Sequence, residues 1–288
     1  MWIGFLLAVL TGLSWTAIGI VLSFCARKNF DVIAYSLAQT LFCTLLTLAV
    51  YLHPGAFAWK PFLLLAACIG TGGFLNALAQ LLVRHAMTLG CHGPVWAISQ
   101  SALVIPFLAG VLLFGNAGSA GQWIGTALIA CGILIPACGE MHAPGRWLVP
   151  TLVTFLLFGI VQTLYLVPSQ LPGFDDASGV RPALASLGGF AGWCLPAAIR
   201  KERTRWDRRT LLPAFGMALL SLASLKIFFL SLDRLSTAGF GNAAVPLIVG
   251  ANILGFAIYS RIVLKERPTR METLGMTAVL GGVSAIAS

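Results

Sequence analysis

Ten apolar runs, separated by short polar segments, constrain the fold of this chain more than any other feature. About 20 mostly apolar residues are needed to cross a bilayer as a helix. Of the 288 residues, 58% are hydrophobic and only 9% are charged. Backbone polar groups in lipid must be hydrogen-bonded within their own segment, which favours helices. The sequence therefore predicts an all-α integral membrane protein with ten transmembrane helices, at residues 2–24, 32–52, 61–83, 90–114, 122–138, 147–168, 180–199, 211–232, 237–264 and 272–287.

Basic residues are divided unequally between the two sets of gaps. The gaps after runs two, four, six and eight, taken with the adjoining ends of the runs, hold three of them, namely Lys60, Arg181 and Arg234. The gaps after runs one, three, five, seven and nine, again with the adjoining ends of the runs, hold fourteen, namely Arg27, Lys28, Arg84, Arg146, Arg200, Lys201, Arg203, Arg205, Arg208, Arg209, Arg261, Lys265, Arg267 and Arg270. Basic loops stay in the cytoplasm, so we expect an inner-membrane protein with both termini outside. The net charge of +9 reflects this orientation signal, and no nucleic-acid partner is expected.

The second half of the sequence repeats part of the first. Residues 149 or 150 positions apart match in pairs: Thr88 with Thr237, Gly90 with Gly239, Gly125 with Gly275, and Gly132 with Gly282. Five helices per repeat is an odd number, so the second repeat must be inserted upside down. We therefore expect two inverted five-helix repeats, residues 1–140 and 146–288, around a central cavity. Secondary transporters use this arrangement.

Lys226 lies inside an apolar run, in the segment LASLKIFFLSL. A polar turn expected at residues 233–236 would place Lys226 about 10 Å inside the end of its helix. An ammonium group at such a depth is unfavourable unless it faces water, a counter-charge or a ligand. The alternative is that the four-carbon side chain extends to the membrane interface. If Lys226 faces the cavity, it should attract an anion or a cluster of hydroxyl groups.

Other polar and aromatic side chains recur at corresponding places in the two halves. An amide in a membrane helix can bind substrate or can simply join two helices, and both possibilities stay open for each residue. Asn252 is one such amide in the ninth run. Pro94 and Pro246 are candidate hinges, because proline removes a helix hydrogen bond. The candidate substrate-binding residues are Lys226, Asn76, Gln80, Trp15, Trp96, Gln100, Gln162, Tyr165 and Asn242.

Features of other protein classes are missing from the sequence. No Asp or Glu lies deep in a run, so a carboxylate proton relay is not indicated. The seven cysteines contain no CxxC pair, and His85 and His92 alone do not make a metal site. No nucleotide-binding or catalytic motif is present. We therefore expect no enzymatic activity, no cofactor and no metal.

The final two helices carry a resemblance to a known family. The stretch RIVLKERPTRMETLGMTAVLGGVSAI and its first-half counterpart VLLFGNAGSAGQWIGTALIACGILI resemble the drug/metabolite transporter superfamily, in its ten-helix EamA-like members. Lys265 and Glu266 fit the pair that the family places before the last helix of a repeat, whereas Gly115 and Asn116 depart from it. The basic first loop and the LKIFF and VLKE stretches look closer to the rhamnose and glucose uptake branches. The resemblance implies a cavity lined by helices one, three, four, six, eight and nine.

These observations predict a secondary-active transporter that moves a small polar metabolite, sugar-like or anionic, by alternating access. Two alternatives stay open: an exporter of amino acids, drugs or other metabolites, and a membrane protein that transports nothing. The expected partners are the substrate and the lipid bilayer. A coupling proton or cation is left open, as is the choice between monomer and homodimer.

Overall fold

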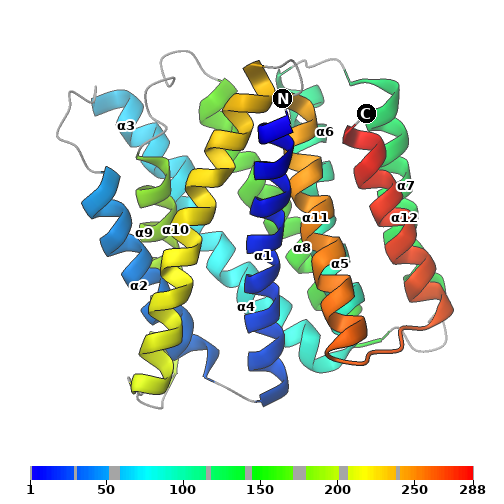
Figure 1. The fold of residues 1–288 in the computed structure, drawn as a ribbon, viewed down its shortest axis with the longest axis horizontal. Helices are drawn as coiled ribbons and strands as arrows, with labels where there is room; N and C mark the ends of the chain where they lie inside the picture. Colours follow the sequence, from blue (N-terminus) through cyan, green and yellow to red (C-terminus); the bar gives the residue numbers. More distant parts are fainter. Residues whose placement is uncertain are drawn as a thin grey trace. The chain divides into compact units, whose positions relative to one another are not determined.

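The computed structural model describes residues 2–28, 31–51, 59–114, 118–139, 145–170, 180–200, 207–237 and 241–287, and these contain helices but no strand (Figure 1). The first half of the chain forms α1 (Trp2–Lys28), α2 (Val32–Tyr51), α3 (Trp59–Leu65), the π-helix η1 (Ala66–Gly70), α4 (Thr71–Leu89), α5 (His92–Gln100), the 3-10 helix η2 (Ser101–Leu103), α6 (Val104–Phe114) and α7 (Ala120–Gly139). The second half forms α8 (Leu148–Leu166), the 3-10 helix η3 (Val167–Gln170), α9 (Arg181–Ile199), α10 (Arg208–Thr237), α11 (Gly241–Ile262) and α12 (Arg270–Ala287).

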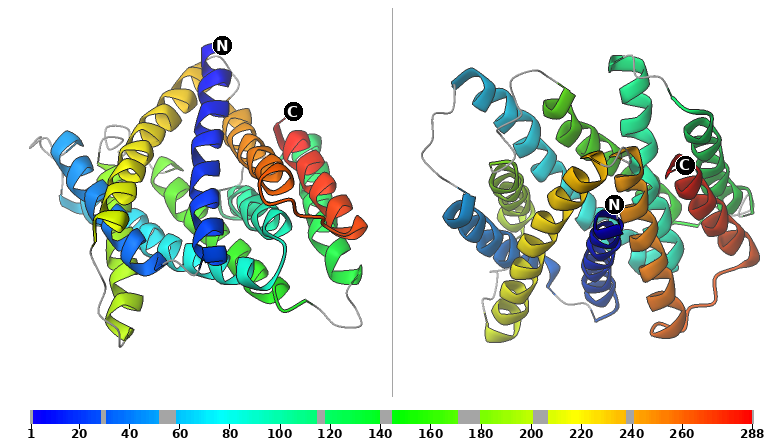
Figure 2. Two further views of the ribbon diagram at one scale, coloured as in Figure 1. Left: turned by 60° about the horizontal axis from the view of Figure 1, so that its bottom comes forward. Right: turned by 45° about the horizontal axis from the view of Figure 1, so that its top comes forward.

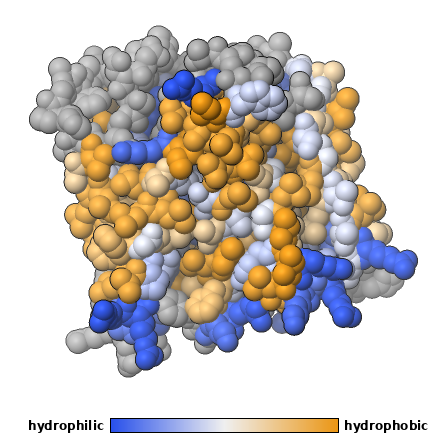
Figure 3. Space-filling model, in the orientation of Figure 1, coloured by the Kyte–Doolittle hydropathy of each residue, from blue (hydrophilic) through white to orange (hydrophobic). Residues whose placement is uncertain are grey.

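Within the described residues, eight helical segments are long and apolar enough to cross a membrane. They are Trp2–Lys28, Val32–Val50, Phe62–Leu89, His92–Leu113, Leu148–Tyr165, Arg181–Ile199, Arg208–Phe228 and Val245–Ile262. Large apolar side chains lie exposed on them, including Leu112 at 78% and Ile199 at 73%. Such surfaces suit lipid better than water, and Figure 3 shows apolar residues across the middle of the face that it draws. The chain is therefore a multi-pass, all-helical membrane protein. α7 and α12 are not among the eight segments.

The polar turn expected at residues 233–236 is wrong, because α10 continues through it to Thr237. Leu235 explains the difference: its side chain is fully buried in a small apolar cluster with Ala8 and Ile248. This contact between distant segments stabilises one more helical turn than the local sequence suggests. Lys226 consequently lies eleven residues before the end of α10, about 16 Å inside the helix rather than about 10 Å.

Two irregular turns interrupt the long helical segments. The π-helix η1 joins α3 to α4, and the 3-10 helix η2 joins α5 to α6. Pro106 gives a physical reason for η2, because a proline cannot donate a hydrogen bond to the carbonyl four residues earlier, that of Ala102. The backbone N–H of Val104 instead donates to the carbonyls of Ser101 and Ala102. The chain tightens locally and then resumes an α-helix.

The chain divides into two compact units. Unit 1 contains Met1–Phe30, Leu82–Leu156 and Ser224–Ser288, and unit 2 contains Asp31–Leu81 and Leu157–Ala223. Each unit therefore combines segments from both expected repeats, residues 1–140 and 146–288. The two inverted five-helix repeats remain a prediction, whereas the units describe which segments pack together.

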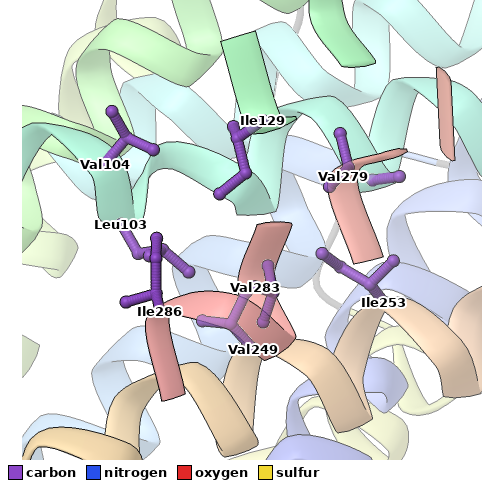
Figure 4. Close-up of a cluster of buried hydrophobic side chains, with 9 residues drawn as sticks. Leu103, Val104, Ile129, Val249, Ile253, Val279, Val283 and Ile286 are labelled. Carbon is purple, nitrogen blue, oxygen red and sulfur yellow. The ribbon is translucent and has the colours of Figure 1, made fainter. Parts of the chain in front are cut away.

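Unit 1 is built around two pairs of closely packed helices, α1 with α11 and α7 with α12, which lie side by side in Figures 1 and 2. Glycines permit the close approach: a Cβ atom on Gly12 would lie 2.3 Å from the carbonyl oxygen of Ile248. Buried apolar residues of η2, α6, α7, α11 and α12 pack against one another and form a hydrophobic core. Figure 4 shows this core, which includes Leu103, Val104, Ile129, Val249, Ile253, Val279, Val283 and Ile286.

Unit 2 is organised around α9, which packs against α2 and against the π-helix η1. Gly188 is required at the second contact, because a Cβ atom there would lie 2.0 Å from the carbonyl oxygen of Gly70. The carboxylate of Asp31, just before α2, forms an ion pair with Arg200 at the end of α9, with 2.6 Å between Asp31 Oδ1 and Arg200 Nη1. Both side chains are partly exposed, so we expect this ion pair to stabilise unit 2 by no more than about 1 kcal/mol.

Candidate functional site

A hydrogen-bonded group centred on Asn252 joins three elements of unit 1. We call it the Asn252 cluster, and it consists of Thr16 from α1, Trp96 and Gln100 from α5, and Asn252 from α11. The indole Nε1–H of Trp96 donates to Asn252 Oδ1 over 3.1 Å, and Asn252 Nδ2 donates to Gln100 Oε1 over 3.1 Å. The Thr16 hydroxyl lies 3.3 Å from the same Oδ1 and 3.2 Å from the Asn252 carbonyl.

The Asn252 cluster sits where helices approach most closely. Asn252 has no exposed surface, and Trp96 is almost completely buried. A Cβ atom on Gly19 would lie 2.8 Å from the Trp96 ring, and one on Gly255 would lie 2.7 Å from the Thr16 hydroxyl. Both the oxygen and the nitrogen of the Asn252 amide already have partners. The geometry therefore makes this residue a junction between helices more than an open binding group.

The two tryptophans expected at the site both make aromatic contacts inside unit 1. Trp15 lies 5.7 Å from the ring of Phe228 on α10, between ring centroids, and is half-buried. Trp96 lies 5.2 Å from the ring of Phe256 on α11. Packing of this kind holds the indoles in place, and it leaves part of the Trp15 ring accessible.

Unit 2 contains four of the sequence-predicted residues, Asn76, Gln80, Gln162 and Tyr165, and no hydrogen-bonded network joins their side chains in the described part of the chain. Asn76 and Gln80 on α4 and Gln162 on α8 are half-buried. Among the described residues, the Gln162 Oε1 atom is buried and accepts no hydrogen bond. Tyr165 packs closely on Gly72, where a Cβ atom would lie 2.5 Å from the tyrosine ring. A buried carbonyl oxygen without a donor is rare in folded proteins and calls for a ligand, a water or a second conformation.

Lys226 belongs to unit 1, where it is exposed on α10. The helix has 30 residues, so Lys226 lies only about 5 Å from its midpoint. Because α10 is longer than the roughly 30 Å core of a bilayer requires, both of its ends can reach polar surroundings. The stretch of α10 that is apolar enough to cross a membrane, Arg208–Phe228, ends two residues after Lys226, so a side chain that extends to the interface and one that faces a cavity both stay open.

The remaining sequence-predicted residues are less informative. The side chain of Asn242 lies outside the described residues, although its backbone is in the first turn of α11. Pro94 is in the first turn of α5, where a proline removes no hydrogen bond of the helix. Pro246 lies inside α11, which continues through it as an α-helix. A hinge at either proline remains a prediction.

Sequence analysis did not identify a second polar junction of unit 1, which lies where α5 begins. The Glu266 carboxylate accepts the backbone N–H groups of His92 over 2.9 Å and Gly93 over 3.1 Å. The His92 Nδ1 atom lies 2.8 Å from the Ser23 hydroxyl of α1. In the sequence, Glu266 is visible only as half of a family-like pair. Its bonds join it to a helix start in the first half of the chain, and no local signal predicts them.

Metal-ligating side chains do not gather anywhere in the described part of the chain. Asp207 lies just before α10, outside the membrane-spanning segments. Its carboxylate accepts a hydrogen bond from the backbone of Thr210 at the start of α10, and bonds to Thr210 hold the Asp207 pKa below its usual value.

Comparisons with known proteins support the fold and leave the activity open. No protein-family model and no curated protein matched the sequence. A protein of known crystal structure has a similar fold, with a TM-score of 0.60 over 98% of this chain and 97% of that one. The two sequences are 13% identical, so this likeness concerns the fold alone.

Proposed function

We propose that this chain is a secondary-active transporter of a small polar metabolite, sugar-like or anionic, built from two inverted five-helix repeats. The observation that carries the proposal is a set of reciprocal contacts between α7 and α12. A Cβ atom on Gly125 would lie 2.4 Å from the Gly282 carbonyl oxygen, and one on Gly132 would lie 2.7 Å from that of Gly275. The sequence offset that matches Gly125 with Gly275 also matches Gly132 with Gly282, so it converts each of these contacts into the other.

A second pair of contacts follows the same rule. Gly132 lies against Val279, and Gly282 lies against Ile129. The same offset of 150 residues matches Gly132 with Gly282 and Ile129 with Val279, so it again converts one contact into the other. Residue numbers rise along α7 as they fall along α12, so the two helices are antiparallel. A two-fold axis that exchanges antiparallel helices is perpendicular to them, and such an axis in a membrane protein lies in the membrane plane. That symmetry favours inverted repeats.

The directions of the other helix pairs agree with ten alternating spans. α1 and α11 run parallel, since Gly12 meets Ile248 and Gly19 meets Phe256. α2 and α9 run antiparallel, because Asp31 at the start of α2 pairs with Arg200 at the end of α9. Counting the continuous helical segments in chain order, the first pair joins spans one and nine and the second joins spans two and seven. In a chain whose spans alternate in direction, two odd-numbered spans run parallel, as the first pair does. An even-numbered and an odd-numbered span run antiparallel, as the second pair does.

We assign the amides of Asn76, Gln80 and Gln162, which all lie in unit 2, to the substrate, and the role of Lys226 in unit 1 is a separate proposal. Lys226 would attract an anion or an electron-rich hydroxyl cluster, and the amides offer both donors and acceptors to hydroxyl groups. The Asn252 cluster is assigned to helix packing instead, because its amide groups are bonded to each other. Ligand contacts of this kind suit a small polar molecule better than a large apolar drug.

Transport can be measured with purified protein reconstituted into proteoliposomes. Currents on a solid-supported membrane report charge movement, and uptake of radiolabelled compounds reports movement of the substrate. The probes are glucose and rhamnose as neutral sugars, glucose 6-phosphate and succinate as anions, and a mixture of amino acids for the exporter alternative. We expect saturable flux of one sugar or anion. A folded protein that moves none of the probes in either direction would contradict the proposal.

Substitutions at Lys226 identify the substrate charge. For an anion, Lys226→Arg should keep flux within about threefold, and Lys226→Gln should lower it at least tenfold, a change of about 1.4 kcal/mol. For a neutral sugar, Lys226→Gln should retain most of the flux. Lys226→Met is the decisive control, since a lysine that merely reaches the interface tolerates an apolar replacement. Wild-type flux in the Met variant would remove Lys226 from the site.

A further inference from the structure

The connection between α11 and α12 presents basic and apolar side chains together at the surface of unit 1. Arg261, Lys265, Arg267 and Arg270 are all exposed. Ile262 and Val263 beside them are 68% and 59% exposed. Figure 3 shows hydrophilic residues at the lower right, over this connection, directly below apolar ones. We call this surface, residues 261–270, the basic connection.

Both acidic side chains of this region, Glu266 and Glu272, accept hydrogen bonds from backbone N–H groups. The two oxygens of Glu266 accept the N–H groups of His92 and Gly93 at the start of α5. Glu272 is only 6% exposed, and it accepts the N–H of Thr269 over 2.7 Å. In the described part of the chain, no ion pair neutralises the four basic residues. The exposed face therefore carries four positive charges at close range.

Hydrogen bonds hold the basic connection in one conformation. The N–H of Val263 donates to the Tyr259 carbonyl over 2.8 Å, and that of Glu266 donates to the Ser260 carbonyl over 3.1 Å. Between them, Lys265 has a left-handed backbone with φ of 55°. A lysine in this conformation is unfavourable unless its neighbours are fixed. The Glu266 carboxylate supplies such an anchor by attaching the connection to α5.

We propose that the basic connection binds the headgroup of an anionic phospholipid. Arginine side chains bind phosphate oxygens through paired N–H groups, and basic segments next to membrane helices attract anionic lipids. Ile262 and Val263 would contact the first carbons of an acyl chain, which a free phosphate or a nucleic acid lacks. The site is separate from the residues assigned to the substrate, so it can be tested whether or not the chain transports.

The test uses the full-length protein in nanodiscs of phosphatidylcholine with increasing phosphatidylglycerol, with bound lipid counted by native mass spectrometry. The site variant is Arg267→Gln with Arg270→Gln. The matched control is Arg208→Gln with Arg209→Gln, which removes the same charge from two exposed residues at the start of α10. We expect retained phosphatidylglycerol to fall at least fivefold in the site variant and less than twofold in the control. Equal losses in both variants would overturn the proposal.

Glu266→Gln separates a built site from general charge attraction. The substitution makes the region more positive, so simple electrostatics predicts more retained phosphatidylglycerol. The proposal predicts at least threefold less retained phosphatidylglycerol. The glutamine amide has a single acceptor oxygen, so it cannot accept the N–H groups of both His92 and Gly93. Unchanged or increased retention would contradict it. Circular dichroism and thermal unfolding in detergent verify that the variant is folded, and if it is not, the paired arginine variants decide the question.

Discussion

Asn252 in unit 1 and Gln162 in unit 2 are both amides inside membrane-spanning helices, yet their surroundings differ. Asn252 is fully buried, and its oxygen and nitrogen both have partners on other helices. The Gln162 Oε1 atom is also buried but accepts no hydrogen bond from the described residues. An amide whose oxygen and nitrogen are both hydrogen-bonded to other helices fixes the packing of those helices. An amide oxygen without a donor can still accept a hydrogen bond from a ligand. This difference separates residues that stabilise the fold from residues that can serve the substrate.

Asn252→Leu should have the largest effect on stability. The substitution keeps a similar volume but leaves the buried Trp96 N–H and the partly buried Gln100 carbonyl without their partner. We expect the free energy of unfolding to fall by about 2–4 kcal/mol, within the range for buried groups that lose a hydrogen bond. Denaturant unfolding in detergent, followed by tryptophan fluorescence, measures the change. A loss below about 0.5 kcal/mol, the lower end of what one hydrogen bond contributes, would show that the cluster is not a structural junction.

Trp96→Phe should have a smaller effect, because it removes one donor and keeps most of the ring that packs on Phe256. Asn252 Oδ1 would still be close to the Thr16 hydroxyl. We expect a loss of about 1 kcal/mol, typical of one hydrogen bond between membrane helices. The same unfolding measurement applies, and Trp15→Phe is the control because it changes an indole that packs on Phe228 outside the Asn252 cluster. Equal losses in the two variants would assign the effect to aromatic packing alone.

The positions of the helices could be predicted from sequence because apolar length determines where a membrane helix can lie. The expected span 32–52 agrees with α2, and the span 180–199 agrees with α9. The prediction of a turn at residues 233–236 was wrong because Leu235 is buried in a cluster with Ala8 and Ile248, which are distant in sequence. Local polarity contains no information about such a contact.

The candidate site was predictable only as a set of polar residue types. Sequence analysis identified Trp96, Gln100 and Asn252 as polar or aromatic residues in membrane helices, but it could not tell bonded amides from unbonded ones. That distinction depends on which helices are neighbours. The contacts of Glu266 with the start of α5 depend on the same tertiary information.

Gln162→Met tests the central claim most directly, with thermal unfolding and substrate uptake measured on the same preparation. Methionine has nearly the same shape as glutamine and removes the carbonyl oxygen that lacks a donor. We predict a change in unfolding free energy below about 0.5 kcal/mol, since no hydrogen bond is lost, together with at least a tenfold drop in uptake of the transported probe. A clear loss of stability with normal uptake per folded molecule would contradict the account, because Gln162 would then serve the fold, as Asn252 does.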